Sequence, residues 1–239
     1  MRYLGGKSRI AKTIVAQMPS PDDVRNVYEP FCGGGAVTVA LAQKYRAVQA
    51  SDIHEDLICM WRSLQEGWCP PTEVSEELYQ HWRYTEPTTQ EEAALKAFLG
   101  YGGSFGGRYF EGFARGGFTA DGTHRNHQQE SRRRVLSDVQ KMYNVTFCSG
   151  DYEVLVRAKP GDLVYCDPPY KDTKSYSRIE RFDYERFWGW ADRLVETGVS
   201  VYVSEIQAPD GWEPIWSKSQ NRSVKRQGDV TTTESLFTK

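Results

Sequence analysis

The chain has 239 residues, of which 39% are hydrophobic and 26% are charged, and its formal net charge is −2. This composition is typical of a globular protein and excludes a disordered chain, and no run of about 18 apolar residues predicts a transmembrane helix. The five cysteines are scattered without a C-x-x-C pair, and the first residues lack the apolar core of a signal peptide. We therefore expect a cytosolic α/β protein with reduced thiols and no membrane partner.

The N-terminal third has the pattern of a ligand-binding crossover. A predicted strand, Arg25 to Tyr28, leads into Glu29-Pro-Phe-Cys-Gly-Gly-Gly35, and a helix is predicted over Ala36–Lys44. Strand, glycine loop and helix are the layout of a nucleotide-binding first crossover. The loop is not G-x-G-x-x-G, and Glu29 would repel a pyrophosphate. It therefore favours a ligand that carries an amino group and no phosphate.

Two further residues of this region are candidate ligand contacts. Lys7 follows a glycine turn and precedes a predicted helix, where its charge can meet an anion or simply be solvated. A second predicted strand, Ala47 to Ala50, ends at Asp52, where the crossover fold places an acid on ribose hydroxyls. The alternative role for Asp52 is the N-cap of the amphipathic helix predicted from Ile53 to Leu64.

Residues 67–145 interrupt the α/β pattern. Helices are predicted over Glu76–Tyr84, Glu91–Leu99 and about Gln128–Tyr143, with a glycine-rich loop over 100–118. This change of composition predicts an inserted module. The catalytic domain would then comprise residues 1–66 and 146–239.

The inserted module has the composition of a nucleic-acid contact. Residues 100–134 hold six arginines against three acids, and aromatic residues alternate with them. Such a pattern favours base stacking and phosphate contact, with aromatics that tuck into the protein as the alternative. The candidates for nucleic-acid contact are Arg108, Arg115 and Arg125. The pair His124 and His127 lacks further nearby ligands, so we predict no metal site.

The α/β pattern resumes with a predicted strand over Val145–Cys148 and reaches its clearest motif at residues 163–170. Apolar residues 163–166 predict a buried strand, which Asp167, Pro168, Pro169 and Tyr170 follow. The prolines keep the chain extended and out of the sheet, so the carboxylate stands at a strand's carboxyl end. Asp167 and the Pro168 carbonyl suit the two protons of a planar exocyclic amine, with Tyr170 stacked on its ring. A capped Pro-Pro turn without function is the alternative.

The C-terminal part predicts a helix over Tyr184–Glu196, a strand over Val199–Val203 and a hairpin with a basic loop. Residues 217–228 hold four basic residues and no acid. Three of the four, Arg222, Lys225 and Arg226, are candidates for phosphate contact.

Four ordered motifs place the chain beside a known family: Tyr3-Leu-Gly-Gly-Lys7, Glu29 to Gly35, Ser51-Asp52-Ile53 and Asp167-Pro-Pro-Tyr170. With them the chain resembles the Dam-like DNA adenine-N6 methyltransferases over nearly its whole length. The run Gly-Gly-Ser-Phe-Gly-Gly-Arg108 is more similar to phage-encoded relatives. The resemblance implies the Rossmann-like α/β fold of S-adenosylmethionine-dependent methyltransferases. That fold has seven strands, the last antiparallel, and a target-recognition module between the second and third strands of the chain.

The resemblance also implies the site and the reaction. The cofactor S-adenosylmethionine would contact Tyr3, Lys7, Glu29, Pro30, Phe31, Gly33, Gly35, Asp52, Ile53, Asp151, Tyr152 and Asp167. The catalytic residues would be Asp167, Pro168, Pro169 and Tyr170. The reaction would move a methyl group to N6 of an adenine flipped out of double-stranded DNA. The protein would act as a monomer or weak dimer without an obligatory protein partner.

Three other functions stay open on the sequence. The first is methylation of cytosine N4, an RNA adenine or a protein glutamine, which Asp167 disfavours because Ser or Asn usually replaces that acid in such relatives. The second is an inactive DNA-binding relative, which the intact motif at 167–170 disfavours. The third is a nicotinamide oxidoreductase, which Glu29 and the missing G-x-G-x-x-G disfavour.

Overall fold

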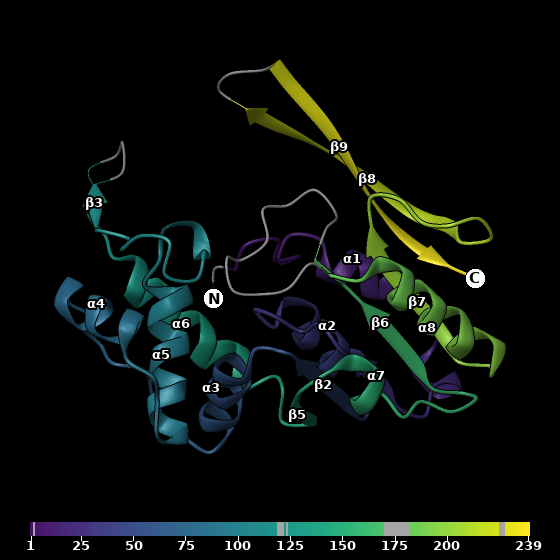
Figure 1. The fold of residues 1–239 in the computed structure, drawn as a ribbon, viewed down its shortest axis with the longest axis horizontal. Helices are drawn as coiled ribbons and strands as arrows, with labels where there is room; N and C mark the ends of the chain where they lie inside the picture. Colours follow the sequence, from purple (N-terminus) through teal and green to yellow (C-terminus); the bar gives the residue numbers. More distant parts are fainter. Residues whose placement is uncertain (2, 119–121, 123, 170–181, 225–227) are drawn as a thin grey trace.

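A computed structural model describes residues 1, 3–118, 122, 124–169, 182–224 and 228–239, with the backbone alone at residues 124, 220–224 and 228–232. A seven-stranded sheet in the order β5-β2-β1-β6-β7-β9-β8 forms its centre. Helices cover the sheet, a mainly helical region lies beside it, and a long hairpin rises from it (Figure 1).

Five neighbouring strands of the sheet run parallel: β5 (Val145–Ser149), β2 (Val48–Asp52), β1 (Val27–Glu29), β6 (Leu163–Cys166) and β7 (Ser200–Glu205). The last strand, β9 (Gly228–Thr238), pairs antiparallel with β7 and also with β8 (Glu213–Val224). It is therefore the reversed strand of the sheet. This topology confirms the predicted Rossmann-like methyltransferase architecture.

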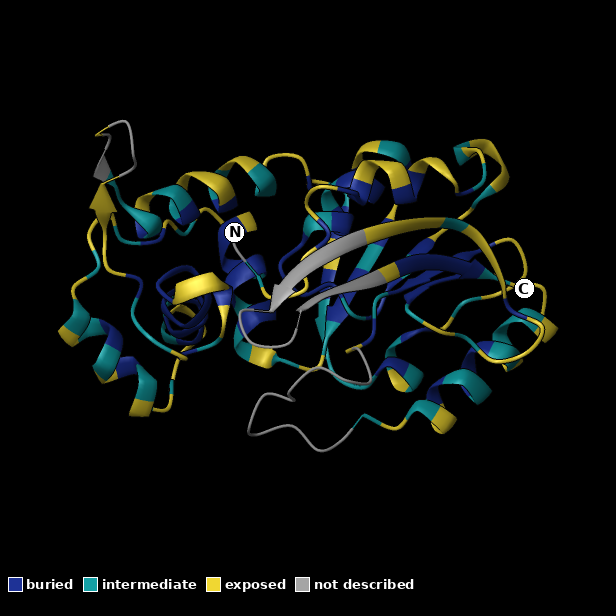
Figure 2. Ribbon diagram, turned by 90° about the horizontal axis from the view of Figure 1, so that it is seen from above, coloured by how far each residue is buried: buried dark blue, intermediate teal, exposed yellow. Residues whose placement is uncertain are grey.

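Both faces of the sheet are buried, which explains why β6 is a continuous apolar run. Leu163 and Tyr165 belong to one core cluster, and Val164 and Cys166 belong to a second. The first cluster includes side chains of α1 (Ala11–Ala16), α2 (Ala36–Lys44) and α3 (Glu55–Gln65), and the second those of α7 (Tyr152–Leu155) and α8 (Tyr184–Glu196). Figure 2 shows the buried residues at the centre and the exposed ones on the outer faces of the helices.

The region between α3 and β5 is mainly helical. It contains α4 (Glu76–Tyr84), α5 (Gln90–Gly102), α6 (His127–Val139), the short helix η2 (Phe105–Gly107) and the hairpin of β3 (Gly117–Phe118) with β4 (His124–Arg125). Its helix α5 packs along α3 of the sheet domain. The predicted helices over 36–44, 76–84 and 184–196 are present with those bounds.

The glycine-rich loop departs from the prediction at its start. We predicted irregular structure from Gly100, but α5 continues through Gly102. A Cβ atom on Gly100 would lie 2.3 Å from Tyr109 Cε2, so the glycine lets the chain fold back across the end of the helix. Tyr101 and Phe110 are buried there, whereas Phe105 and Phe118 are exposed. The interpretation of the loop's aromatics as DNA-stacking residues is therefore wrong for the two buried rings.

The C-terminal segments form one hairpin of β8 and β9, which extends above the sheet in Figure 1. The prediction of a basic loop is wrong for Arg222, which lies within β8 because the strand pairing continues to Val224. Lys225 and Arg226 lie outside the described residues. Among the described residues, no helix has the length and apolar character needed to cross a membrane.

Candidate active site

Three acids stand at the carboxyl ends of three adjacent parallel strands. Glu29 is the last residue of β1, Asp52 is the last residue of β2, and Asp167 directly follows β6. Because β1 lies between β2 and β6, the sheet brings the three predicted site residues to one edge. Ligands of open α/β sheets bind at this edge, where the strand order reverses.

Asp167 is held by a buried lysine from the other end of the chain. Lys7 Nζ donates to Asp167 Oδ1 over 2.8 Å and lies 3.3 Å from Glu234 Oε1 of β9. Burial raises the pKa of Asp167, Lys7 opposes that rise, and Glu234 adds to it. Burial alone would lower the pKa of Lys7, but Asp167 and Glu234 together raise it. Lys7 is thus a cation fixed beside the predicted catalytic acid.

The two prolines differ in their surroundings. Pro168 is buried, whereas Pro169 is exposed, and the Tyr184 hydroxyl of α8 donates to the Pro169 carbonyl. Tyr170 lies outside the described residues, so its predicted stacking role stays a prediction.

Glu29 is a buried acid with an unused oxygen. It is 2% exposed, and its Oε2 atom has no hydrogen-bond partner among the described residues. Burial raises the pKa of Glu29 to about 8, with Asp167 and Asp52 adding to the rise against a hydrogen bond from Thr38. A buried oxygen without a partner is costly, which fits a ligand that supplies a donor or a positive charge. Pro30 beside it is also buried.

The glycine loop is packed under two aromatic rings. Gly33 and Gly35 have positive φ angles of 45° and 71°. A Cβ atom on Gly33 would lie 2.8 Å from the Tyr3 ring, and one on Gly35 would lie 2.9 Å from Trp61. Trp61 Nε1 also donates to the Gly33 carbonyl over 3.2 Å. A side chain at either glycine would therefore collide with the protein's own aromatic rings.

Asp52 connects the glycine loop to α3. Its Oδ2 accepts from the Gly33 amide over 2.9 Å, and its Oδ1 accepts from the His54 amide over 3.0 Å. The N-cap of α3 is His54, whose Nδ1 accepts from Leu57 N, so the alternative role of Asp52 as an N-cap is excluded. Burial raises the pKa of Asp52. Ile53 beside it is exposed, as a ligand contact requires.

A second aromatic cluster joins two more predicted cofactor residues. The rings of Phe31 and Tyr152 have centroids 5.3 Å apart, and Arg186 of α8 lies over Tyr152. Asp151 caps α7 through the Glu153 amide and forms an ion pair of 2.8 Å with Arg186. No local pattern marks Arg186, which lies in the first turn of the amphipathic helix α8.

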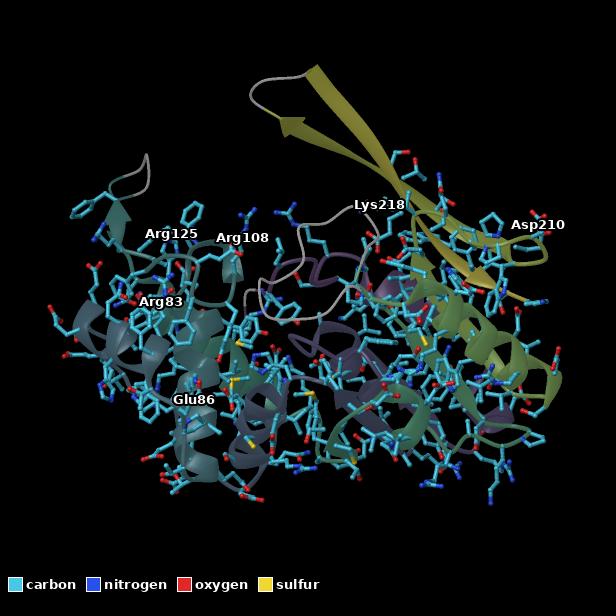
Figure 3. The ribbon with its side chains drawn as sticks, viewed as in Figure 1. Arg83, Glu86, Arg108, Arg125, Asp210 and Lys218 are labelled. Carbon is cyan, nitrogen blue, oxygen red and sulfur yellow. The ribbon has the colours of Figure 1, made fainter. Side chains whose placement is uncertain are left out.

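The three candidate arginines of the inserted region each carry an acidic partner. The pairs, with N–O distances, are Arg108–Glu111 at 3.4 Å, Arg115–Glu76 at 2.7 Å and Arg125–Glu130 at 2.7 Å. In Figure 3 the labels of Arg108 and Arg125 lie on the side from which β3 projects, with Lys218 across from them on the hairpin. To bind a DNA phosphate or base, each of these arginines must give up its ion pair with the neighbouring glutamate.

Two buried acids near Asp167 were not predicted from the sequence. Glu205 ends β7, and Glu234 lies in β9. Burial raises the pKa of Glu205 to about 7, and Asp167 adds to the rise. The strand-end rule that found Asp167 would also have found Glu205, whereas no local pattern marks Glu234. Within the described ranges, no three or more His, Cys, Asp or Glu side chains gather to hold a metal ion.

The chain is similar to known DNA methyltransferases. The family described as D12 class N6 adenine-specific DNA methyltransferase matches residues 3–99 and 105–207. The Type II methyltransferase M1.LlaDCHI of Lactococcus lactis subsp. cremoris is 25% identical over 87% of this chain and 81% of its own length. A DNA adenine methylase of Vibrio cholerae is 27% identical over 71% of this chain and 64% of its own. The DNA N-6-adenine-methyltransferase of Escherichia phage P1 is 23% identical over 96% of this chain and 33% of its own.

The match spans both halves of the sheet domain and contains Lys7, Glu29, Asp52 and Asp167. These residues meet at the ligand-binding edge of a methyltransferase-type sheet. The protein thus belongs to the D12 class of N6 adenine-specific DNA methyltransferases.

Proposed function

We propose that this enzyme takes its methyl group from S-adenosylmethionine and delivers it to an adenine flipped out of duplex DNA at a specific sequence. The observation that carries the proposal is the position of Asp167 directly after β6, fixed by Lys7 at 2.8 Å and followed by the buried Pro168. An amine inside a base pair cannot reach a carboxylate at the edge of a sheet. The adenine must therefore leave the stack, at a cost of a few kcal/mol.

The residues at the sheet edge fit S-adenosylmethionine, which when bound supplies a methyl group on a positively charged sulfur. Asp52 would hold the ribose hydroxyls, and Glu29 would face the amino group of the methionine part. The partnerless Oε2 of Glu29 supports that second role. Phe31 and Tyr152 would contact the adenine ring, since they pack together beside the glycine loop.

Asp167 and Pro168 prepare the target nitrogen for attack. The lone pair of adenine N6 is conjugated into the ring, so N6 is a poor nucleophile. Hydrogen bonds from its two protons to the Asp167 carboxylate and the Pro168 carbonyl favour a pyramidal nitrogen with a free lone pair. As N6 gains the methyl group it must lose one proton, and Asp167 is the acceptor within reach. Alignment and charge stabilisation at this site supply much of the rate.

We further propose that residues 67–145 form the target-recognition module and that residues 1–66 and 146–239 form the catalytic domain. The position of the helical region between α3 and β5 supports this division. Arg108, Arg115 and Arg125 would contact the target sequence from the module. Arg222 of β8, together with Lys225 and Arg226, would bind phosphate.

Transfer of labelled methyl groups from S-adenosylmethionine to plasmid DNA tests the proposal. We expect N6-methyldeoxyadenosine in the digested product and no label on DNA that already carries adenine methylation at its target. Asp167→Asn should reduce turnover at least ~100-fold, whereas Asp210→Asn, a change at an exposed loop, should not. Label in N4-methylcytosine, label in RNA in preference to DNA, or normal turnover of Asp167→Asn would each contradict the proposal.

A further inference from the structure

One buried ammonium is shared by two carboxylates at the active site. Lys7 Nζ lies 2.8 Å from Asp167 Oδ1, 3.3 Å from Glu234 Oε1 and 3.2 Å from the Gly5 carbonyl. The three charged side chains are 4%, 19% and 10% exposed. The ammonium donates hydrogen bonds to Asp167 and to the Gly5 carbonyl, and its contact with Glu234 is an ion pair. These three contacts fix the position of the Lys7 ammonium.

Glu234 reaches this site from β9. Glu234 precedes Ser235, and Ser235 pairs with Glu205 of β7. Glu234 therefore lies in the strand that joins the hairpin to the rest of the sheet. The N-terminal segment brings Lys7, and β6 brings Asp167. A buried ion pair is strongly destabilised when one partner is lost, because an uncompensated charge stays behind. Lys7 thus forms ion pairs with two acids, the predicted catalytic residue Asp167 and the buried Glu234 of β9.

We propose that Glu234 is a positioning residue for methyl transfer: by holding Lys7 between the two carboxylates, it keeps Asp167 a strong hydrogen-bond acceptor for the target amine. This inference rests on the proposed role of Asp167. Without Glu234, the charge of Lys7 would act more strongly on Asp167. A carboxylate paired that closely accepts hydrogen bonds from a second donor less strongly.

The titratable groups that face Asp167 come from several elements packed against it. They are Lys7 from the N-terminal segment, Glu29 from β1, Glu205 from β7 and Glu234 from β9, with Tyr165 preceding on its own strand. Among them Lys7 lowers the pKa of Asp167 and Glu234 raises it. Removal of Lys7 should therefore raise the pKa of Asp167, and removal of Glu234 should lower it. A merely structural role for Glu234 does not require this shift.

The first test follows the titration of Asp167 by carbon NMR of labelled carboxyl groups, with its signal assigned from Asp167→Asn. The protein carries neither cofactor nor DNA. Glu234→Gln should move the midpoint to lower pH, Lys7→Gln should move it to higher pH, and Glu213→Gln, an exposed change on the same hairpin, should not move it. A midpoint that is unchanged or raised in Glu234→Gln would overturn the inference. This measurement stands even if the enzyme proved not to methylate DNA.

The second test is kinetic. Glu234→Gln should lower kcat about ten-fold, less than the loss for Asp167→Asn, with KM for cofactor and DNA within about two-fold of the original. The acid limb of its kcat–pH profile should move to lower pH together with the NMR midpoint. Glu234→Asp keeps the charge and should recover part of kcat; it also serves if Glu234→Gln does not fold. A raised KM with unchanged kcat, or no recovery in Glu234→Asp, would show that Glu234 acts only in binding or folding.

Discussion

Replacing Glu29 with glutamine should make the stability of the fold less dependent on pH. Burial raises the pKa of this carboxyl from an ordinary 4.5 to about 8. Between those two values the unfolded chain is ionised at this position while the folded protein keeps the proton. Folding then takes up a proton, so the contribution of Glu29 to stability is complete below pH 4.5 and is lost as pH rises to 8.

The size of the effect follows from that window. One pH unit within it changes the free energy of unfolding by at most about 1.4 kcal/mol for one group. Between pH 5 and 7, Glu29 should therefore reduce stability by about 2–3 kcal/mol, which is a large share of the stability of a typical domain. Glutamine has nearly the same shape and no titration. The cost of burying its amide is the same at each pH, so it does not affect the slope.

Urea unfolding at pH 5, 6 and 7 measures the prediction as the difference between the original protein and Glu29→Gln. That difference cancels the contributions of other titrating groups such as Glu205. Glu185→Gln, a change at an exposed glutamate of α8, is the matched control and should leave the slope unchanged. If the difference between the original protein and Glu29→Gln were constant from pH 5 to 7, the carboxyl would not be neutral in the folded protein.

Three further changes test other parts of the molecule. Asp52→Ala should weaken binding of S-adenosylmethionine by about 1–3 kcal/mol. It should also lower the melting temperature, because the Asp52 carboxylate accepts a hydrogen bond from the Gly33 amide. Unchanged cofactor affinity in calorimetry would exclude the ribose role. Gly100→Ala should lower the free energy of unfolding by about 1–3 kcal/mol, since its Cβ would collide with Tyr109, and urea unfolding equal to the original would refute that packing. Glu76→Gln should release Arg115 from its ion pair and raise the affinity for duplex DNA about three-fold at low salt, a change within the range for an exposed ion pair. If Glu76→Gln, Arg115→Ala and the original protein bound DNA equally well, Arg115 would not contact DNA.

The sheet edge could be predicted because each of its acids ends an apolar run. Glu29, Asp52 and Asp167 stand where a strand pattern stops, and the carboxyl ends of parallel strands meet at one edge. Such a signal is local, so the sequence displays it directly. The same rule applies to Glu205, which ends β7. We did not predict it because we ended the predicted strand two residues earlier, at Val203.

The partners of those acids could not be predicted because they depend on contacts between distant segments. Lys7 and Asp167 are 160 residues apart, and nothing around either one names the other. The packing of the glycine loop could not be predicted for a related reason. A side chain at Gly33 or Gly35 would collide with the rings of Tyr3 and Trp61, and those rings come from separate elements.

The lysine shared by Asp167 and Glu234 also bears on how the enzyme acquires activity during synthesis. Its three members come from the beginning, the middle and the last strand of the chain, so the network cannot close until β9 has inserted between β7 and β8. Contacts over such separations form late, because the loop between them must first be closed at an entropic cost. A nascent chain on the ribosome can thus complete β6 and its Asp-Pro-Pro motif well before the acid at its end is correctly charged. Methylation of DNA would begin only after β9 has been synthesised and has paired with the sheet.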